Sequence, residues 1–272
     1  MQATTRYSAV INSGCLLWMP PMAEQEYRDA MASLLYAQLA ARKQHSPVND
    51  PGKWQEVFGS ALTRFGWAPL RTGYRSRGAD EHFRLAELIE AADLPLTEPQ
   101  RQAGGQLCTY LAALPGADPQ LQLLQRNIAG YADLDAVDGV DGDTSDGHGL
   151  DLMDDFEALS CPAPTQGRAR QVQALRRPAP RAVVTAHFGM LLPQRRIELL
   201  SVHFATQQRL AANIFEQSFS GAKVLDGILL RSFVGELSEM SYAPFRAQFD
   251  TLLKPYWQQQ VVEHLPFSRA TP

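Results

Sequence analysis

The stretch from Asn127 to Gly167 contains no lysine or arginine, and it holds ten of the 29 acidic residues of the chain. Aspartate that alternates with glycine cannot bury apolar surface, so this acidic stretch is expected to stay hydrated and to separate two folded units. The sequence therefore predicts a mainly helical domain over residues 1–130, a linker over 131–178 and a second domain over 179–272. Without the ten acidic residues, the formal net charge of −4 becomes 25 − 19 = +6, so the two units together are mildly basic.

The first flank of the acidic stretch has the pattern of a helical domain. Hydrophobic residues make up 45% and charged residues 20% of the 272 residues, which is enough for each flank to bury a core. Helices are predicted from apolar residues at helical spacing over 23–43, 50–66, 80–92, 97–114 and 118–130. Thr97 and Gln100 form a capping-box pattern at the start of the fourth helix. Residues 67–77 are expected to be extended or looped.

In the second flank the apolar period becomes that of a strand. Strands are predicted over 183–192, 196–207, 213–219 and 224–237. The connections are too short for crossover helices, so these strands should form antiparallel hairpins. An apolar stripe from Phe245 to Val261 predicts a C-terminal helix that is interrupted at Pro255. The expected fold class is α+β, with an N-terminal helical module followed by an antiparallel β-sheet module and a C-terminal helix.

Three aspartates of the acidic stretch, Asp141, Asp143 and Asp146, are compared with the pattern of a calcium-binding loop, which they match only in part. Asp141 and Asp143 match its first positions, since hard cations prefer clustered carboxylate oxygens. Asp146, however, stands at the sixth position, where a sharp turn needs glycine, and Leu152 stands where a bidentate glutamate is needed. We therefore expect a hydrated linker and no metal or other cofactor, with these three aspartates as the alternative ligands.

A basic segment follows the acidic stretch. Its five arginines, with no acid among them, are Arg168, Arg170, Arg176, Arg177 and Arg181. Such a segment could bind nucleic acid or an anionic membrane surface, although it lacks the interleaved aromatic residues that stack on bases. The alternative is that the arginines pair with the acidic stretch itself. A third possibility is that the acidic stretch masks the arginines, so that a partner must displace the acidic stretch before it can bind them.

His187 and His203 flank the turn that is predicted near Gln194. A three-residue loop over 194–196 would place the two histidines opposite each other on paired strands, with their Cβ atoms about 5 Å apart. In that position they could hold a metal together with a third ligand, or act as acid and base in hydrolysis. The alternative is that both are half-buried strand residues without a chemical role.

Other signals of chemistry are weak in this sequence. It contains no nucleophile elbow, no phosphate-binding loop, no dinucleotide fingerprint and no zinc-protease motif. Cys15, Cys108 and Cys161 are too few and too widely spaced for a disulfide framework or a zinc site, and Cys108 is expected to be a small core residue. No apolar run approaches the length of about 20 residues that a membrane helix needs. A cytoplasmic location is expected, with secretion without a cleaved signal as the alternative.

The function expected from these observations is that of a non-enzymatic interaction or assembly protein. A bacterial effector or virulence-associated accessory protein would be a narrower form of this expectation, with another protein or a second copy of the chain as partner. One alternative is a hydrolase or metal-dependent enzyme centred on His187 and His203. The other is an anion-binding module that uses the segment from Arg168 to Arg181 for nucleic acid or acidic lipid.

Overall fold

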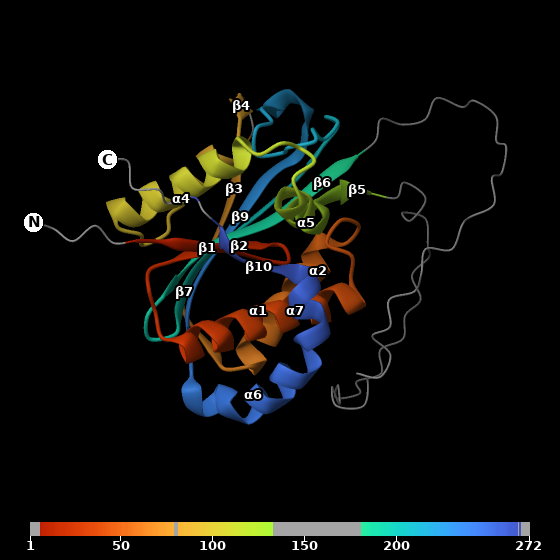
Figure 1. Ribbon diagram of the computed structural model, residues 1–272. Coiled ribbons are helices and arrows are strands. Elements are labelled where there is room, and N and C mark those ends of the chain that lie inside the picture. The colour runs from red at the N-terminus through yellow and green to blue at the C-terminus, as the bar shows by residue number, and fades with distance from the viewer. Residues whose placement is uncertain (1–5, 79–80, 133–180, 266, 268–272) are drawn as a thin grey trace, which may run out of the picture. The chain divides into compact units, whose positions relative to one another are not determined.

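The computed structural model of the chain describes residues 6–78, 81–132, 181–265 and 267, and these residues belong to one compact unit (Figure 1). Its α-helices are α1 (Glu24–Gln44), α2 (Pro51–Arg64), α3 (Leu85–Glu90), α4 (Glu98–Ala112), α5 (Pro119–Ile128), α6 (Glu239–Leu252) and α7 (Lys254–Gln260). Its strands are β1 (Ser8–Asn12), β2 (Cys15–Met19), β3 (Trp67–Arg77), β4 (His82–Phe83), β5 (Ala129–Tyr131), β6 (Ala182–Leu192), β7 (Arg196–Thr206), β8 (Phe219–Ser220), β9 (Val224–Leu237) and β10 (Val261–Leu265). A short 3₁₀ helix, η3 (Gly221–Lys223), precedes β9.

A mixed sheet runs through this unit. Its strands lie in the order β10-β1-β2-β6-β7-β9-β3, and β5 pairs with one end of β6. All neighbouring strands are antiparallel except β2 and β6, which are parallel and pair Cys15–Trp18 with His187–Met190. Since β2 precedes the acidic stretch and β6 follows it, the centre of the sheet joins the two flanks.

The fold class is α+β, but the expected split into a helical module and a sheet module is wrong. Strands β1, β2 and β3 interleave with the helices of the first flank and extend the sheet of the second. The reason is that β2 is buried along its whole length and β1 over four of its five residues. Strands buried on both faces lack the alternation of apolar and polar residues by which a strand is recognised in a sequence.

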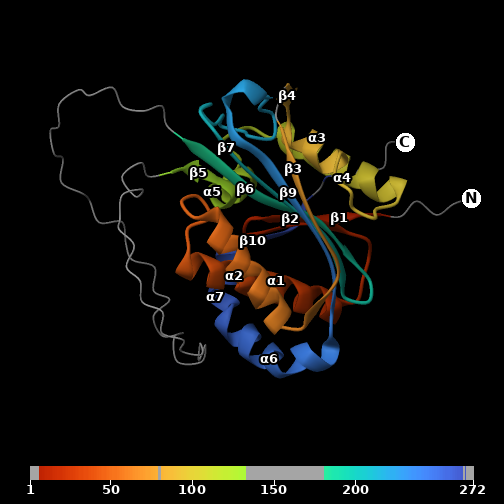
Figure 2. The ribbon, with the colours of Figure 1, turned by 180° about the vertical axis from the view of Figure 1, so that it is seen from behind.

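Helices cover both faces of the sheet (Figures 1 and 2). On one face α3, α4 and α5 pack on a core that includes Phe188 and Phe204. On the other face Trp54 and Phe58 of α2 pack against His187, the residue next to Phe188. Successive residues of β6 therefore face different helical layers, as the two-residue period of a strand requires. No helix within the described residues is long and apolar enough to cross a membrane.

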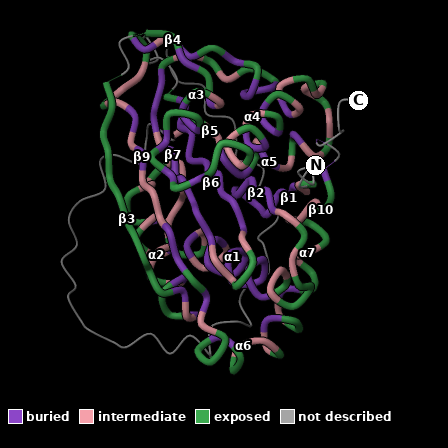
Figure 3. Tube along the Cα trace, turned by 90° about the vertical axis from the view of Figure 1, so that its left-hand side faces the viewer, coloured by how far each residue is buried: buried purple, intermediate pink, exposed green. Residues whose placement is uncertain are grey.

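The strands differ strongly in burial (Figure 3). Strands β6 and β7 lie in the middle of the sheet and are buried over most of their length, whereas β3 is exposed from Ala68 to Arg77. In the described part of the chain β3 is an end strand that pairs with β9 alone. Pro69 and a shift of register between Pro69 and Arg71 interrupt this edge, which limits pairing with further strands.

Most predicted elements of the two flanks are confirmed. The helices α1, α2, α4 and α5 form where helical periodicity was found, and the capping box of Thr97 and Gln100 is present. The C-terminal helix is divided into α6 and α7 immediately before Pro255. The helix expected over 80–92 is shorter, because β4 takes up its first part.

The strand predicted over 213–219 is wrong, since Phe219 alone of this segment lies in a strand, the two-residue β8. Asn213 accounts for the difference. Its side-chain amide donates to the carbonyl oxygens of Leu111, Ala112 and Leu114 at the end of α4, and its Oδ1 accepts from the amide of Phe215. These bonds tie the segment to α4 as a loop, which local sequence patterns do not reveal.

The turn between β1 and β2 is buried in the unit. Ser13 is fully buried and has a φ of 55°, and its amide donates to the carbonyl oxygen of Gln260 at 2.7 Å. The side chain of Gln38 in α1 forms two hydrogen bonds to this turn. Its Oε1 accepts from the amide of Gly14 at 2.8 Å, and its Nε2 donates to the carbonyl oxygen of Asn12 at 3.0 Å. A buried turn is tolerated here because its backbone groups have partners.

Candidate functional site

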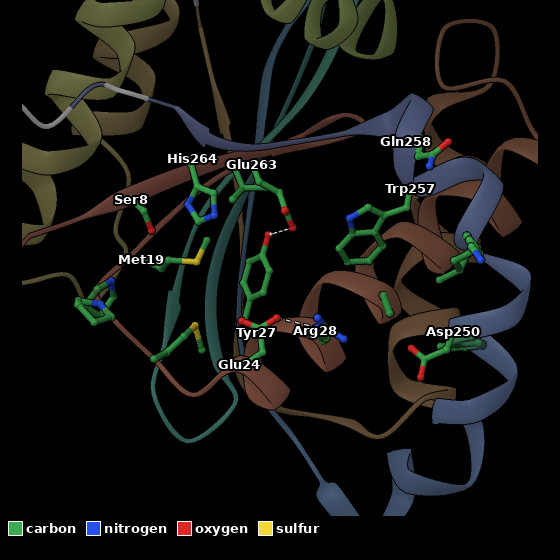
Figure 4. A pocket seen from close by; sticks show the side chains of 18 residues that line it. Ser8, Met19, Glu24, Tyr27, Arg28, Asp250, Trp257, Gln258, Glu263 and His264 are labelled. Atoms are coloured by element: carbon green, nitrogen blue, oxygen red, sulfur yellow. Dashed lines mark hydrogen bonds and ion pairs between the residues drawn. The ribbon is translucent and has the colours of Figure 1, made fainter.

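A cleft of about 520 Å³ lies between the start of α1, the strands β1 and β10, and the helices α6 and α7 (Figure 4). We call it the Trp257 cleft. Its apolar lining comes from Val10, Met19, Pro20, Pro21, Met22, Ala32, Phe249, Leu253 and Trp257. Its polar lining comes from Ser8, Glu24, Tyr27, Arg28, Asp250, Lys254, Gln258, Glu263 and His264. A larger cavity, of about 820 Å³, lies along α4 and is lined mainly by polar side chains.

The apolar wall of the cleft is formed by segments that are far apart in the chain. Met19 ends β2, and the two prolines that follow carry the chain across to the start of α1. Trp257 reaches the cleft from α7 and is only partly buried, whereas Trp18, Trp54 and Trp67 are each at most 2% exposed. Tryptophan side chains are enriched at protein interfaces, where the indole is partly apolar contact surface and partly in water.

Two pairs of polar side chains lie in the cleft (Figure 4). The hydroxyl of Tyr27 donates a hydrogen bond of 2.6 Å to the carboxylate of Glu263, which joins α1 to β10. Nε of Arg28 donates to the carboxylate of Glu24 at 2.7 Å. Burial, and then the hydrogen bond to Glu263, raise the pKa of Tyr27, so the phenol stays protonated and acts as a donor. A tyrosine that stays protonated can donate a hydrogen bond, but it does not serve as a base at neutral pH.

The backbone at His264 is in the left-handed region, with a φ of 59°. Neighbouring strand residues normally point to opposite faces of a sheet, yet both Glu263 and His264 line the cleft. The pairing of β1 with β10 also shifts register between Ala9 and Ile11. Left-handed backbone is uncommon outside glycine and is retained where the surrounding structure or a function requires it. The fold thus holds both side chains in the cleft at a local conformational cost.

The two histidines singled out in the sequence do not line this cleft. The expected pairing of His187 opposite His203 is wrong, because Thr185 pairs with His203 and His187 pairs with Ser201. The turn occupies 193–195, as the predicted strand bounds require, and not the 194–196 loop on which the histidine pairing depends, since Leu192 pairs with Arg196 and both Gln194 and Arg195 adopt positive φ. Moving the loop by one residue offsets the two histidines by two positions along the strands.

His187 has the surroundings of a core residue, whereas His203 is partly buried. His187 is 1% exposed, packs against the rings of both Trp54 and Phe58, and has Nδ1 within 2.8 Å of Oγ of Ser201. Burial lowers the pKa of His187 to about 3. Burial, and then the nearby arginines, lower the pKa of His203 to about 4. In the part of the chain that the structure describes, no group of three or more histidine, cysteine, aspartate or glutamate side chains could hold a metal ion.

The other predicted site residues are mostly not described. Asp141, Asp143 and Asp146, and the arginines Arg168, Arg170, Arg176 and Arg177, lie outside the described residues. Nη2 of Arg181 lies 3.9 Å from the carboxylate of Asp226, and both side chains are exposed. Cys15 and Cys108 are buried free thiols, as expected for Cys108. Burial raises the pKa of Cys108 to about 12, so it is not an activated nucleophile.

The residues of the Trp257 cleft were not among the predicted site residues. Tyr27 falls on the apolar face of its helix in the sequence, where it is indistinguishable from a core residue. Trp257 is the one visible signal, because it lies beside the polar residues 258–260 and outside the apolar stripe of the C-terminal helix. Comparison of the chain with protein-family models, with curated proteins and with solved structures finds no match.

Proposed function

We propose that this protein is a non-enzymatic interaction protein that binds a segment of another polypeptide in the Trp257 cleft. The bound segment presents apolar side chains together with a cationic one. The volume of the cleft, about 520 Å³, lies within the usual range for binding pockets. A cleft of that size takes two or three side chains of an extended or helical segment.

The observation that carries this proposal is the partly exposed indole of Trp257 opposite Met19 and Met22. Tryptophan is the residue type that most often dominates the binding energy of a protein interface. Methionine adapts its shape to different apolar partners because its side chain is unbranched and polarisable. Together they favour a protein segment over one rigid small molecule.

Charge at the border of the cleft favours a cationic partner. Three carboxylates border it, those of Glu24, Asp250 and Glu263, against the two basic side chains of Arg28 and Lys254. An incoming segment therefore meets a small excess of negative charge. Exposed charges of this kind contribute little to affinity, but they select against acidic partners.

The alternative functions have less support. A substrate must reach a catalytic histidine, and His187 is buried against the rings of Trp54 and Phe58. Four of the five arginines of the anion-binding alternative lie outside the described residues, so that alternative remains a prediction.

Fluorescence polarisation of a short labelled peptide that alternates leucine and arginine tests the proposal. One control peptide replaces arginine with glutamate, and a second replaces leucine with serine. The leucine–arginine peptide is expected to bind most tightly. Trp257→Ala should weaken it by about tenfold or more, and Asp250→Asn by about two- to fivefold.

Matched variants separate the cleft from the rest of the surface. Met240→Ala removes an apolar side chain that is 86% exposed elsewhere, and Glu56→Gln removes an exposed charge on α2. Both should bind the peptide as the unmodified protein does. The proposal is wrong if the three peptides bind equally well, or if Trp257→Ala and Met240→Ala have the same effect.

A further inference from the structure

A second cavity, of about 280 Å³, lies where the C-terminal ends of α1 and α5 meet the start of β5. Two arginines line it, Arg42 from α1 and Arg126 from α5. Ser46, Asn127 and Thr185 contribute the other polar side chains, and no carboxylate is among the described residues that line the cavity. It is separate from the Trp257 cleft and shares no lining residue with it.

Among the described residues, Arg42 has only neutral hydrogen-bond partners. Its Nη1 donates to Oδ1 of Asn127, and its Nη2 donates to the carbonyl oxygen of the same residue at 2.7 Å. Its Nε is out of solvent and has no hydrogen-bond partner among the described residues. None of the ion pairs formed by described residues includes Arg42. A guanidinium group has five N–H donors, so this side chain is left with donors to spare.

The charge of Arg42 is poorly compensated by the residues that the structure describes. Burial, and also the positive charge of Arg126, lower the pKa of Arg42 to about 10, so the group stays charged at neutral pH. A cation taken out of water is unfavourable unless an anion accompanies it. The nearby Cys15 does not supply that anion, since burial raises the pKa of its thiol and keeps it neutral.

Helix dipoles offset only part of this charge. Arg42 and Arg126 lie in the last turns of α1 and α5, where a helix carries roughly half a negative charge. Two helix ends therefore supply about one negative charge against two guanidinium groups. About one positive charge remains, and capping of the helices alone does not account for both arginines.

We infer that this cavity binds a phosphate group, either as free phosphate or as part of a small phosphate monoester, between Arg42 and Arg126. The planar fork of donors on arginine matches the oxygen atoms of phosphate. The hydroxyl of Ser46 accepts from the amides of Val48 and Asn49, which leaves its hydrogen to donate to a phosphate oxygen. The volume is just below that of usual ligand pockets, which favours a small anion over a nucleotide.

Phosphorus NMR tests this inference on the full chain. Inorganic phosphate and glycerol phosphate are titrated with the protein at constant ionic strength, and line broadening gives Kd. Both probes are expected to bind. If glycerol phosphate binds more tightly, the natural ligand is an organic phosphate; if the two bind equally, free phosphate is sufficient. Either result supports the site.

Variants place the binding at the two arginines. Arg126→Gln should weaken binding by about tenfold or more, because hydrogen bonds to charged groups are the strong ones. Arg126 is exposed, so this variant should fold even if Arg42→Gln, which releases Asn127, does not. Arg64→Gln, also exposed and in the last turn of α2, removes the same charge elsewhere and should bind normally. The inference is overturned if neither probe broadens, or if Arg126→Gln and Arg64→Gln bind alike.

Discussion

At the scale of single residues, burial decides what a side chain can do. His187 and His203 have the chemistry of an acid–base pair, but their positions in the sheet keep both neutral. Trp257 and His264 carry no motif, yet they line the main cleft. Residue type was readable from the sequence, whereas exposure depends on the packing of distant elements. The packing of α2 on the sheet buries His187, and the pairing of β10 with β1 places His264 in the cleft. The sequence alone could not supply that arrangement.

The two histidines predict that acid weakens the fold. In the folded protein the pKa of His187 is about 3 and that of His203 about 4, against 6.5 for an ordinary histidine. As pH falls below 6.5, the unfolded chain binds protons at these sites and the folded protein does not. The free energy of unfolding should therefore decrease from pH 6.5 to about 4, by at most about 1.4 kcal/mol per pH unit for each histidine. Urea unfolding across this pH range measures the slope.

A variant assigns the slope to its source. His187→Phe keeps an aromatic ring against Trp54 and Phe58 but removes the titrating group. The slope should therefore decrease by at most about 1.4 kcal/mol per pH unit, the contribution of one proton. Ser201→Ala removes the hydrogen-bond partner and keeps the titrating ring, so its slope should remain. Equal slopes for His187→Phe and the unmodified protein would contradict the explanation.

At the scale of elements, sequence patterns were reliable where one element determines its own structure. The capping box at Thr97 set the start of α4, and Pro255 set the division between α6 and α7. Sequence patterns failed where contacts with another helix or strand determine the structure of a segment. Strand β2 forms because it pairs with β1 and β6, and β1 because it pairs with β2 and β10. The loop at Asn213 is held by the end of α4.

The buried turn between β1 and β2 predicts a strong dependence on Gln38. Gln38→Leu would leave the amide of Gly14 buried without its acceptor and would remove the side-chain donor to the carbonyl oxygen of Asn12. We expect a loss of about 2 to 4 kcal/mol in the free energy of unfolding, measured by urea denaturation. Gln44→Leu, at the exposed end of the same helix, should change it by less than about 0.5 kcal/mol. Similar losses in the two variants would mean that the turn does not depend on this side chain.

At the scale of the whole molecule, the position of the acidic stretch does not mark a boundary between separate cores. The flanks share one sheet through the parallel pair of β2 and β6. Pairing between strands more than 160 residues apart leaves no local trace in a sequence. Parallel strands need a long connection, and the one between β2 and β6 includes the helices α1 to α5.

This shared sheet predicts that neither flank folds alone. Residues 1–133 and 180–272, produced as two separate chains, should each lack a stable fold, because β2 and β6 would expose their central edges. Co-expressed, the two chains should assemble and copurify, with the far-ultraviolet circular dichroism of the described unit. If the two chains fold independently and do not associate, the prediction is wrong and the two-module arrangement is correct.

The place of β10 also sets the order in which the molecule becomes competent. Of the described strands, β10 comes last in the sequence, pairs with β1, the first, and supplies Glu263 and His264 to the Trp257 cleft. A ribosome releases β1 long before β10. A nascent chain that has not yet reached Glu263 and His264 therefore lacks one wall of the cleft.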